Sequence, residues 1–168
     1  AVEASLKLKE VGRILMVGDE AAVRAELAKY PKADAQRLCV VHAPETISMD
    51  ESPATAVRKK KLCSINICMD LLKRGEADAM VSAGNSGAVA AAAVFNLGRI
   101  PGVLRPAIAT VMPTRQPKRP LLLLDAGANT DCHETWLAQF AVMGSAYSRA
   151  VLKRTEPVVG LLSIGTED

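Results

Sequence analysis

Aromatic side chains are scarce in this chain of 168 residues, where phenylalanine, tyrosine and tryptophan together make up 3%. Surfaces that bind single-stranded nucleic acids rely on aromatic rings that stack on bases, so this scarcity argues against that function. The net charge of +3 is also too small to demand DNA or RNA as a partner. Aliphatic side chains must fill the core, which suits strands and helices packed in layers.

Several other signatures are missing. The four cysteines form no CxxC pair, and His42 and His133 lack metal-ligand spacing relative to them, so we assign no metal site and no cofactor. The longest apolar run, residues 88–95, is far below the roughly 20 residues that a membrane-spanning helix needs. A dinucleotide fingerprint G-x-G-x-x-G is absent, which argues against a dehydrogenase.

The apolar periodicity predicts one α/β layered domain over residues 1–168. Helices are expected at residues 2–11, 21–29, 65–74, 88–95 and 134–151, with a further helix start at Ser52-Pro53. Strands are expected at residues 13–17, 38–41, 79–81, 107–112, 121–124 and 158–164. The first two strands should be parallel, and the pair 107–112 and 121–124 antiparallel, so the sheet should be mixed.

The stretch Met80-Val81-Ser82-Ala83-Gly84-Asn85-Ser86-Gly87-Ala88 is the strongest candidate for a ligand site. Gly84 and Gly87 let a backbone bend tightly or approach a ligand, and the free N–H groups at the start of the following helix favour an anion. Asn85 and Ser86 would add side-chain donors. The alternative is that Asn85 or Ser86 only caps the helix.

A second polar turn, Asp125-Ala126-Gly127-Ala128-Asn129, follows the apolar run 121–124. Ligands of open α/β sheets bind beyond the carboxyl ends of the strands, so two such turns in one sheet can share one site. The alternative is that Asp125 or Asp131 caps the helix that begins near His133.

Four consecutive cations, Arg58-Lys59-Lys60-Lys61, form the most basic stretch of the chain. Such a run is most often a solvated helix face, but it also suits an acidic protein or phosphate groups as a partner.

These stretches, in this order along the chain, resemble the bacterial phosphate acyltransferase family of phospholipid synthesis, PlsX. The resemblance rests on motifs spread through nearly the whole chain: Val17-Gly18-Asp19-Glu20, Met49-Asp50-Glu51, Arg58-Lys59-Lys60, Gly75-Glu76-Ala77-Asp78-Ala79, Ser82-Ala83-Gly84-Asn85-Ser86-Gly87-Ala88, Gly98-Arg99-Ile100-Pro101-Gly102, Arg105-Pro106, Leu124-Asp125-Ala126-Gly127-Ala128-Asn129 and Gln139-Phe140-Ala141. Several such motifs in the right order are far more specific than a single glycine motif.

The resemblance implies transfer of a long-chain fatty acyl group from acyl carrier protein to inorganic phosphate. It also implies a three-layer α/β/α fold similar to isocitrate dehydrogenases and phosphotransacetylases, and a cytoplasmic homodimer working at the membrane surface. The family usually has a strand and a Gly-Gly-Asp loop before the region matched by residues 2–11, and continues past Gly165-Thr166-Glu167 with a lysine-containing loop. We therefore expect this chain to be part of a longer polypeptide.

Attack of phosphate on a thioester needs an aligned anion and donors where negative charge develops on the carbonyl oxygen. We assign these catalytic tasks to Asn85, Ser86, Asp125 and Asn129. Substrate binding is assigned to Gly84, Gly87, Gly127, Arg58, Lys59 and Lys60. A phosphotransacetylase that uses coenzyme A and a non-catalytic domain that binds phosphate or an acyl ligand are the two alternatives.

Overall fold

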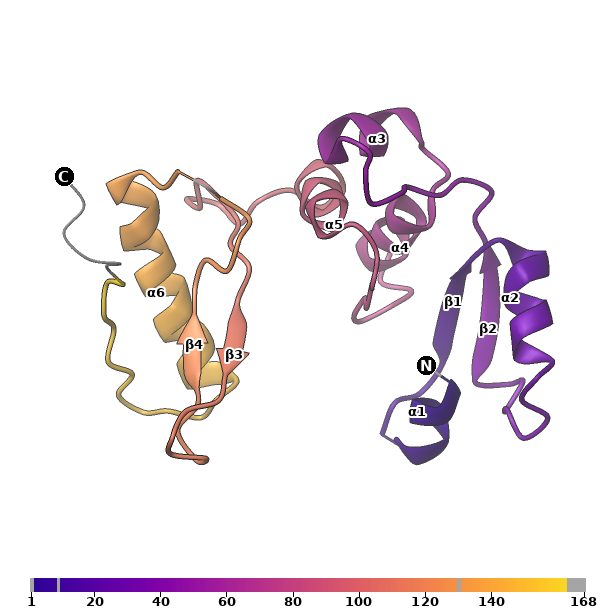
Figure 1. Ribbon diagram of the computed structural model, residues 1–168, viewed down its shortest axis with the longest axis horizontal. Helices are drawn as coiled ribbons and strands as arrows, with labels where there is room; N and C mark the ends of the chain where they lie inside the picture. Colours follow the sequence, from indigo (N-terminus) through magenta and orange to yellow (C-terminus); the bar gives the residue numbers. More distant parts are fainter. Residues whose placement is uncertain (1, 9, 130, 163–168) are drawn as a thin grey trace. The chain divides into compact units, whose positions relative to one another are not determined.

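The computed structural model describes residues 2–8, 10–129 and 131–162, and the chain forms two compact units, Ala1–Gly98 and Arg99–Asp168 (Figure 1). The first unit contains α1 (Val2–Lys7), β1 (Ile14–Gly18), α2 (Glu20–Leu27), β2 (Leu38–His42), α3 (Pro53–Lys59), α4 (Ser64–Lys73), α5 (Ser86–Ala92) and the π-helix η1 (Ala93–Leu97). The second contains β3 (Thr110–Met112), β4 (Leu121–Leu123) and α6 (Glu134–Ala150).

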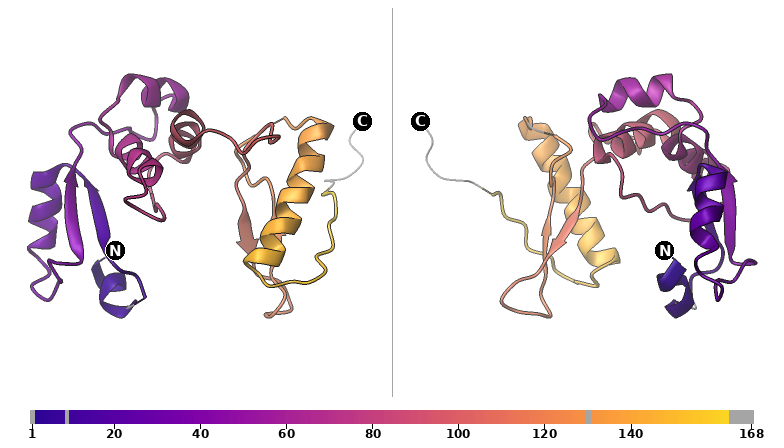
Figure 2. Two further views of the ribbon diagram at one scale, coloured as in Figure 1. Left: turned by 180° about the vertical axis from the view of Figure 1, so that it is seen from behind. Right: turned by 45° about the vertical axis from the view of Figure 1, so that its right-hand side comes forward.

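The first unit begins with a β-α-β arrangement. Strands β1 and β2 pair in parallel, from Ile14 opposite Leu38 to Gly18 opposite His42, which confirms the predicted orientation. Helix α2 connects them and lies against one face of the pair in both views of Figure 2. Asp19 caps α2, because its Oδ1 accepts a hydrogen bond of 2.8 Å from the Ala22 N–H.

The core of the first unit lies among α3, α4 and α5. Its buried members are small or aliphatic side chains: Val57, Cys63, Ile65, Met69, Ala88 and Ala92. The predicted helix start at Ser52-Pro53 is confirmed, with Pro53 as the first residue of α3. The helix predicted over residues 65–74 is confirmed as α4, because its apolar side chains recur at helical spacing and face this core.

The second unit is a short hairpin with one long helix. Strands β3 and β4 pair antiparallel, with Thr110 opposite Leu123 and Met112 opposite Leu121, as predicted. Helix α6 has 17 residues, contacts β4 and buries Phe140 (Figures 1 and 2). None of the helices in the described part of the chain is long and apolar enough to cross a membrane.

Two predicted strands are wrong in the described residues. Residues 78–83 form a loop in which Val81 is 98% exposed, and residues 158–162 are irregular, with Val158 96% exposed. A strand forms only where a partner accepts its backbone hydrogen bonds, and neither segment pairs with another described segment. The remainder of the final predicted strand, residues 163–164, lies outside the described residues.

Two further expectations need correction. The first helix ends at Lys7 rather than at residue 11. The strands belong to two separate two-stranded sheets rather than to one mixed sheet, because β1 pairs only with β2 and β3 only with β4 in the described ranges. The fold shown is therefore mixed α/β with a small parallel sheet, and the single domain stays a prediction.

Candidate functional site

Asn85 is buried at the start of α5 and uses both ends of its amide. Its Oδ1 accepts a hydrogen bond of 3.0 Å from the Ala88 N–H, so the N-cap alternative is confirmed for Asn85. Its Nδ2 lies 3.2, 3.5 and 3.3 Å from the backbone carbonyl oxygens of Ser48, Met49 and Glu51. The side chain therefore ties the start of α5 to the loop before α3, with its own donors occupied.

The backbone of the same turn has hydrogen-bond donors that remain open in the described structure, unlike those of the Asn85 side chain. The N–H groups of Ser86 and Gly87 and the exposed Ser86 hydroxyl have no hydrogen-bond partner within the described part of the chain. Free N–H groups at a helix start carry a partial positive charge. At this turn, which the sequence predicts to bind an anion, the donors left open in the described structure are therefore those of Ser86 and Gly87 rather than the Asn85 amide.

The two glycines of the turn differ in their surroundings. A Cβ added to Gly87 would lie 2.8 Å from Cγ of Pro53, whereas one added to Gly84 would lie an ordinary 3.5 Å from Oγ of Ser82. Gly87 thus lets α3 and α5 approach each other closely. The sequence predicts that both glycines let the backbone bend tightly or approach a ligand, and packing against Pro53 explains Gly87 without a ligand.

The loop before α3 is held by Glu51, a residue to which sequence analysis gave no role. Its carboxylate accepts hydrogen bonds from Lys60 Nζ at 2.7 Å and from the Ser48 N–H at 2.8 Å. These bonds favour the ionised form and lower the pKa of Glu51 to about 2. Lys60 Nζ also donates to the carbonyl oxygen of Thr46 at 2.7 Å, so Lys60 acts as a structural cation here.

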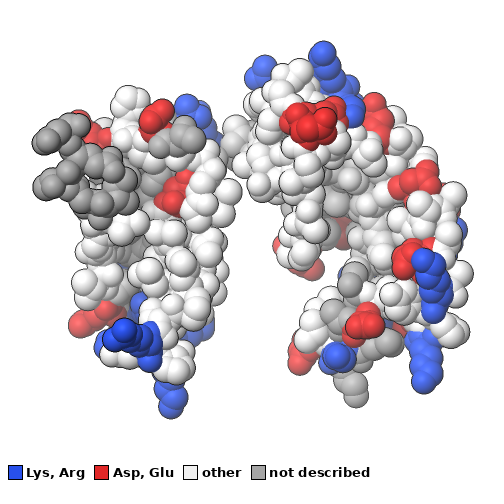
Figure 3. Space-filling view, viewed as in Figure 1, with Lys and Arg blue, Asp and Glu red and all other residues white. Residues whose placement is uncertain are grey.

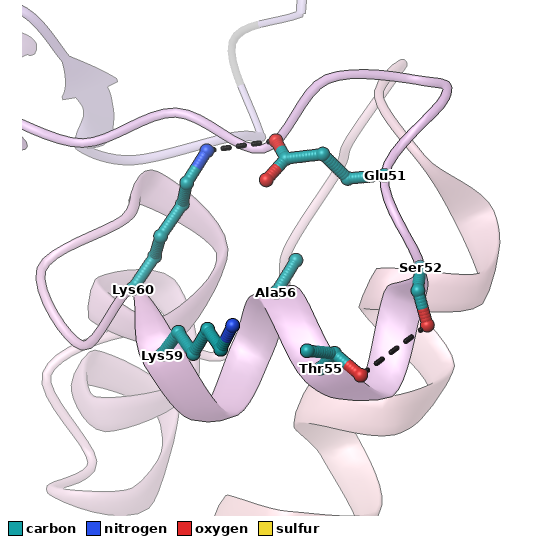
Figure 4. A pocket seen from close by; sticks show the side chains of 6 residues that line it. All are labelled: Glu51, Ser52, Thr55, Ala56, Lys59 and Lys60. Atoms are coloured by element: carbon teal, nitrogen blue, oxygen red, sulfur yellow. Dashed lines mark hydrogen bonds and ion pairs between the residues drawn. The ribbon is translucent and has the colours of Figure 1, made fainter.

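A cavity of about 140 Å³ adjoins this ion pair and is lined by Glu51, Ser52, Thr55, Ala56, Lys59 and Lys60. Figure 4 shows Lys60 reaching Glu51, whereas Lys59 extends along the helix. The hydroxyls of Ser52 and Thr55 lie 3.4 Å apart at the start of α3.

The four residues of the predicted basic run therefore lie in different environments. Lys60 pairs with Glu51, and the Arg58 guanidinium lies 4.6 Å from the centre of the Phe95 ring. The side chains of Lys59 and Lys61 are exposed and make no hydrogen bond or ion pair with any residue that the structure describes. Figure 3 shows lysine and arginine side chains projecting over α3 beside a patch of carboxylates.

In the second unit, Asp125 organises the turn after β4. Its Oδ1 accepts a hydrogen bond of 2.7 Å from the Ile108 N–H, and its Oδ2 accepts from the Asn129 N–H at 2.7 Å and from Asn129 Nδ2 at 3.0 Å. Asn129 Nδ2 also donates to the carbonyl oxygen of Pro106 at 3.0 Å. The two predicted residues are thus brought together, and they fix segment 106–108 against the turn.

Burial acts to raise the pKa of Asp125, but the donors around it outweigh burial and hold that pKa below its ordinary value. Asp125 is therefore ionised at neutral pH, and its oxygens are occupied as acceptors. Gly127, at the tip of the turn, has φ of +128°, a backbone conformation that favours glycine. This arrangement suits a role in ordering the turn.

The expectation that Asp125 or Asp131 caps the following helix is wrong. The N-cap of α6 is His133, which makes no capping hydrogen bond through its side chain. Asp125 instead accepts the Ile108 N–H from the segment before β3, a pairing between distant residues that helix-start patterns do not encode.

The second turn borders a groove of about 710 Å³ between β4, α6 and residues 157–162. Its walls are mainly aliphatic and include Leu122, Leu137 and Ala141, with Asp125 and Asn129 among the polar lining residues. The two predicted turns belong to different units, so a site shared by them stays a prediction. In the described ranges, no group of three or more His, Cys, Asp or Glu side chains could hold a metal ion.

A further buried polar residue lies outside the predicted site. Asn66 on α4 donates from Nδ2 to the carbonyl oxygens of Val57 and Lys60, each at 2.9 Å, and accepts from Asn96 Nδ2 at 2.9 Å. It thereby satisfies carbonyl groups at the end of α3. An asparagine among the core-facing positions of a predicted helix was the signal that could have identified it.

A comparison with protein-family models gives a match over residues 1–168 to the family described as fatty acid synthesis protein. The chain belongs to this fatty acid synthesis protein family, PlsX. The match includes both polar turns and the basic run, and it confirms the resemblance inferred from the motifs.

Curated members of the family carry a more specific name. A protein of Nostoc punctiforme named phosphate acyltransferase is 53% identical over 169 residues, which cover 99% of this chain and 49% of that protein. Proteins with the same name from Elusimicrobium minutum and Oleidesulfovibrio alaskensis are 51% and 47% identical, covering 92% and 100% of this chain and 45% and 46% of their own lengths. The chain thus spans about half the length of the curated relatives that it matches.

Proposed function

We propose that the protein transfers a long-chain fatty acyl group from acyl carrier protein to inorganic phosphate, forming acyl phosphate for phospholipid synthesis. The observation that carries this proposal is the 53% identity, over nearly the whole chain, to a protein named phosphate acyltransferase. In the reaction, an oxygen of hydrogen phosphate attacks the thioester carbonyl carbon and a C–O bond forms. The C–S bond then breaks, its electron pair stays on sulfur, and the proton of hydrogen phosphate ends on the released thiol.

The first turn supplies donors of the kind that this reaction needs. In our proposal the free N–H groups of Ser86 and Gly87, with the Ser86 hydroxyl, bind the phosphate anion or the thioester oxygen. Asn85 holds the turn against the loop 48–51. This assignment is supported by the fact that these donors have no partner among the described residues, whereas the Asn85 amide is fully occupied.

The second turn takes a positioning role in the proposal. Asp125 and Asn129 bind each other and the segment 106–108, and Gly127 gives the turn its tip. An ionised Asp125 whose oxygens accept several N–H groups is a poor general base, so we propose that it shapes a substrate wall.

The proposal includes the whole-protein properties that the family resemblance implies. These are a three-layer α/β/α fold with a mostly parallel sheet, a homodimer, and a cytoplasmic protein that associates peripherally with the inner face of the membrane. They rest on the family membership and on the mixed α/β structure of this chain.

Lys59 and Lys61 are the proposed steering cations for the acidic carrier protein, with Arg58 beside them. Charge reversal in a Lys59→Glu/Lys61→Glu double variant should lower the association rate with the carrier, most strongly at low salt. Lys32→Glu/Lys118→Glu is the matched control, because Lys32 and Lys118 are exposed and remote in sequence from the run. An association rate equal in the double variant and the control, as measured by stopped flow, would remove the steering role.

The activity itself is tested by phosphate-dependent release of free thiol from acyl carrier protein, with acyl-CoA as the second donor, using the full-length protein. Preference for the carrier supports the proposal. Preference for acyl-CoA would indicate a phosphotransacetylase, and phosphate binding without thiol release would indicate a binding domain.

A further inference from the structure

The guanidinium of Arg105 is held on an aromatic surface. Its guanidinium carbon lies 4.7 Å from the centre of the Trp136 ring, and the His133 ring meets the same indole edge-on at 4.7 Å. Arg105 is exposed and forms no hydrogen bond or ion pair with any residue of the described ranges. Stacking on a ring face restrains a guanidinium while leaving its five N–H donors free.

This cation lies next to the second polar turn. Pro106, the next residue, accepts a hydrogen bond from Asn129 Nδ2 at 3.0 Å, and the Ile108 N–H donates to Asp125 at 2.7 Å. The Ala126 N–H closes the arrangement by donating to the Ile108 carbonyl oxygen at 2.9 Å. Three hydrogen bonds therefore fix the backbone that carries Arg105 to the turn.

The carboxylate of the adjoining turn is already occupied. Asp125 directs its oxygens to backbone and amide N–H groups, and no ion pair joins it to Arg105. An arginine that is oriented by an indole and lacks a carboxylate partner presents the planar set of donors that binds phosphate in bidentate fashion.

We propose that Arg105 binds the inorganic phosphate substrate at the rim of the Asp125–Asn129 turn, with Trp136 holding the guanidinium in place. The inference rests on the proposed function, since it names the residue that recognises one substrate of that reaction. The acyl carrier's thiol arm is attached through a phosphodiester, which has related chemistry. We propose inorganic phosphate as the ligand of Arg105, and the experiment distinguishes it from the phosphodiester of the carrier.

The experiment measures binding of inorganic phosphate to the full-length protein by calorimetry, without an acyl donor, for the wild type and for Arg105→Gln. We expect at least tenfold weaker binding in Arg105→Gln. Arg105→Lys should recover only part of the affinity, because an ammonium keeps the charge but not the bidentate geometry. The matched control is Arg115→Gln, an exposed arginine in the β3–β4 loop without a partner in the described residues, which should bind as the wild type does.

Steady-state kinetics distinguish the two phosphate sources. Arg105→Gln should raise the KM for phosphate and leave the KM for acyl carrier protein unchanged. A raised KM for the carrier with an unchanged KM for phosphate would overturn the proposal and assign Arg105 to the phosphodiester. Unaltered phosphate affinity in Arg105→Gln would also overturn the proposal. If Arg105→Gln does not fold, wild-type phosphate affinity in Arg105→Lys would overturn it instead.

Two results would distinguish a failure of the Arg105 binding role from a failure of the proposed acyltransferase activity. Normal thiol release with an unchanged KM for phosphate in Arg105→Gln overturns the role of Arg105 and leaves the acyltransferase intact. Arg105-dependent phosphate binding in a protein that releases no thiol supports the binding role, while the acyltransferase proposal fails.

Discussion

Replacing Asn85 by alanine should weaken the start of α5 by about 2 to 3 kcal/mol. The lost N-cap bond to the Ala88 N–H accounts for about 1 kcal/mol. The Nδ2 group has two hydrogens, so it serves at most two of its three neighbouring carbonyl groups well at one time, at about 1 kcal/mol for each bond. Asn85 is only 6% exposed to solvent, so water replaces these bonds poorly.

Asn85→Asp separates the two functions of the amide. Aspartate is as good an N-cap as asparagine, so the variant should keep the bond to Ala88. It loses the donors and places a carboxylate beside the carbonyl oxygens of Ser48, Met49 and Glu51. We therefore expect Asn85→Asp to be at least as destabilising as Asn85→Ala.

Native-state hydrogen exchange of the Ala88 amide in the full-length protein measures this local stability directly. A loss of 2 to 3 kcal/mol corresponds to a fall in protection of about 30- to 150-fold. Wild-type protection in Asn85→Asp would refute the reasoning, because it would reduce Asn85 to a simple helix cap.

Two further predictions concern the same unit. Gly87→Ala should destabilise this unit by about 1 to 3 kcal/mol, because the new Cβ would lie 2.8 Å from Cγ of Pro53. The stability of Gly84→Ala should lie within about 0.5 kcal/mol of the wild type. Equal denaturation midpoints for the two variants would contradict the packing argument. The low pKa of Glu51, about 2 against an ordinary 4.5, means that its pairing with Lys60 stabilises the fold above about pH 4.5 and that this stabilisation disappears as the pH falls toward 2. The difference in unfolding free energy between wild type and Glu51→Gln should therefore shrink over this pH range, and a constant difference would show that the ion pair is not its cause.

Local signals along the chain predicted local structure well. The Ser52-Pro53 start of α3 and the spacing of apolar residues in α4 act within a few residues, so one sequence suffices to identify them. The parallel pairing of β1 with β2 follows from a strand, a helix and a second strand in close succession.

Such local patterns do not predict interactions between segments that are distant in the sequence. Asn85 meets carbonyl groups 34 to 37 residues away, and Arg105 stacks on Trp136. The residue types at these positions were visible in the sequence, but their partners depend on how the chain folds back. Residues 79–81 show the same limit, since their apolar character favours a strand only where a neighbouring strand is available.

The most direct test of the account is phosphate-dependent thiol release from long-chain acyl carrier protein by the full-length protein. We expect release that requires phosphate, yields one acyl phosphate for each thiol and proceeds faster with the carrier protein than with acyl-CoA. Absence of thiol release from either donor, in a folded protein that binds phosphate, would contradict the proposed acyltransferase.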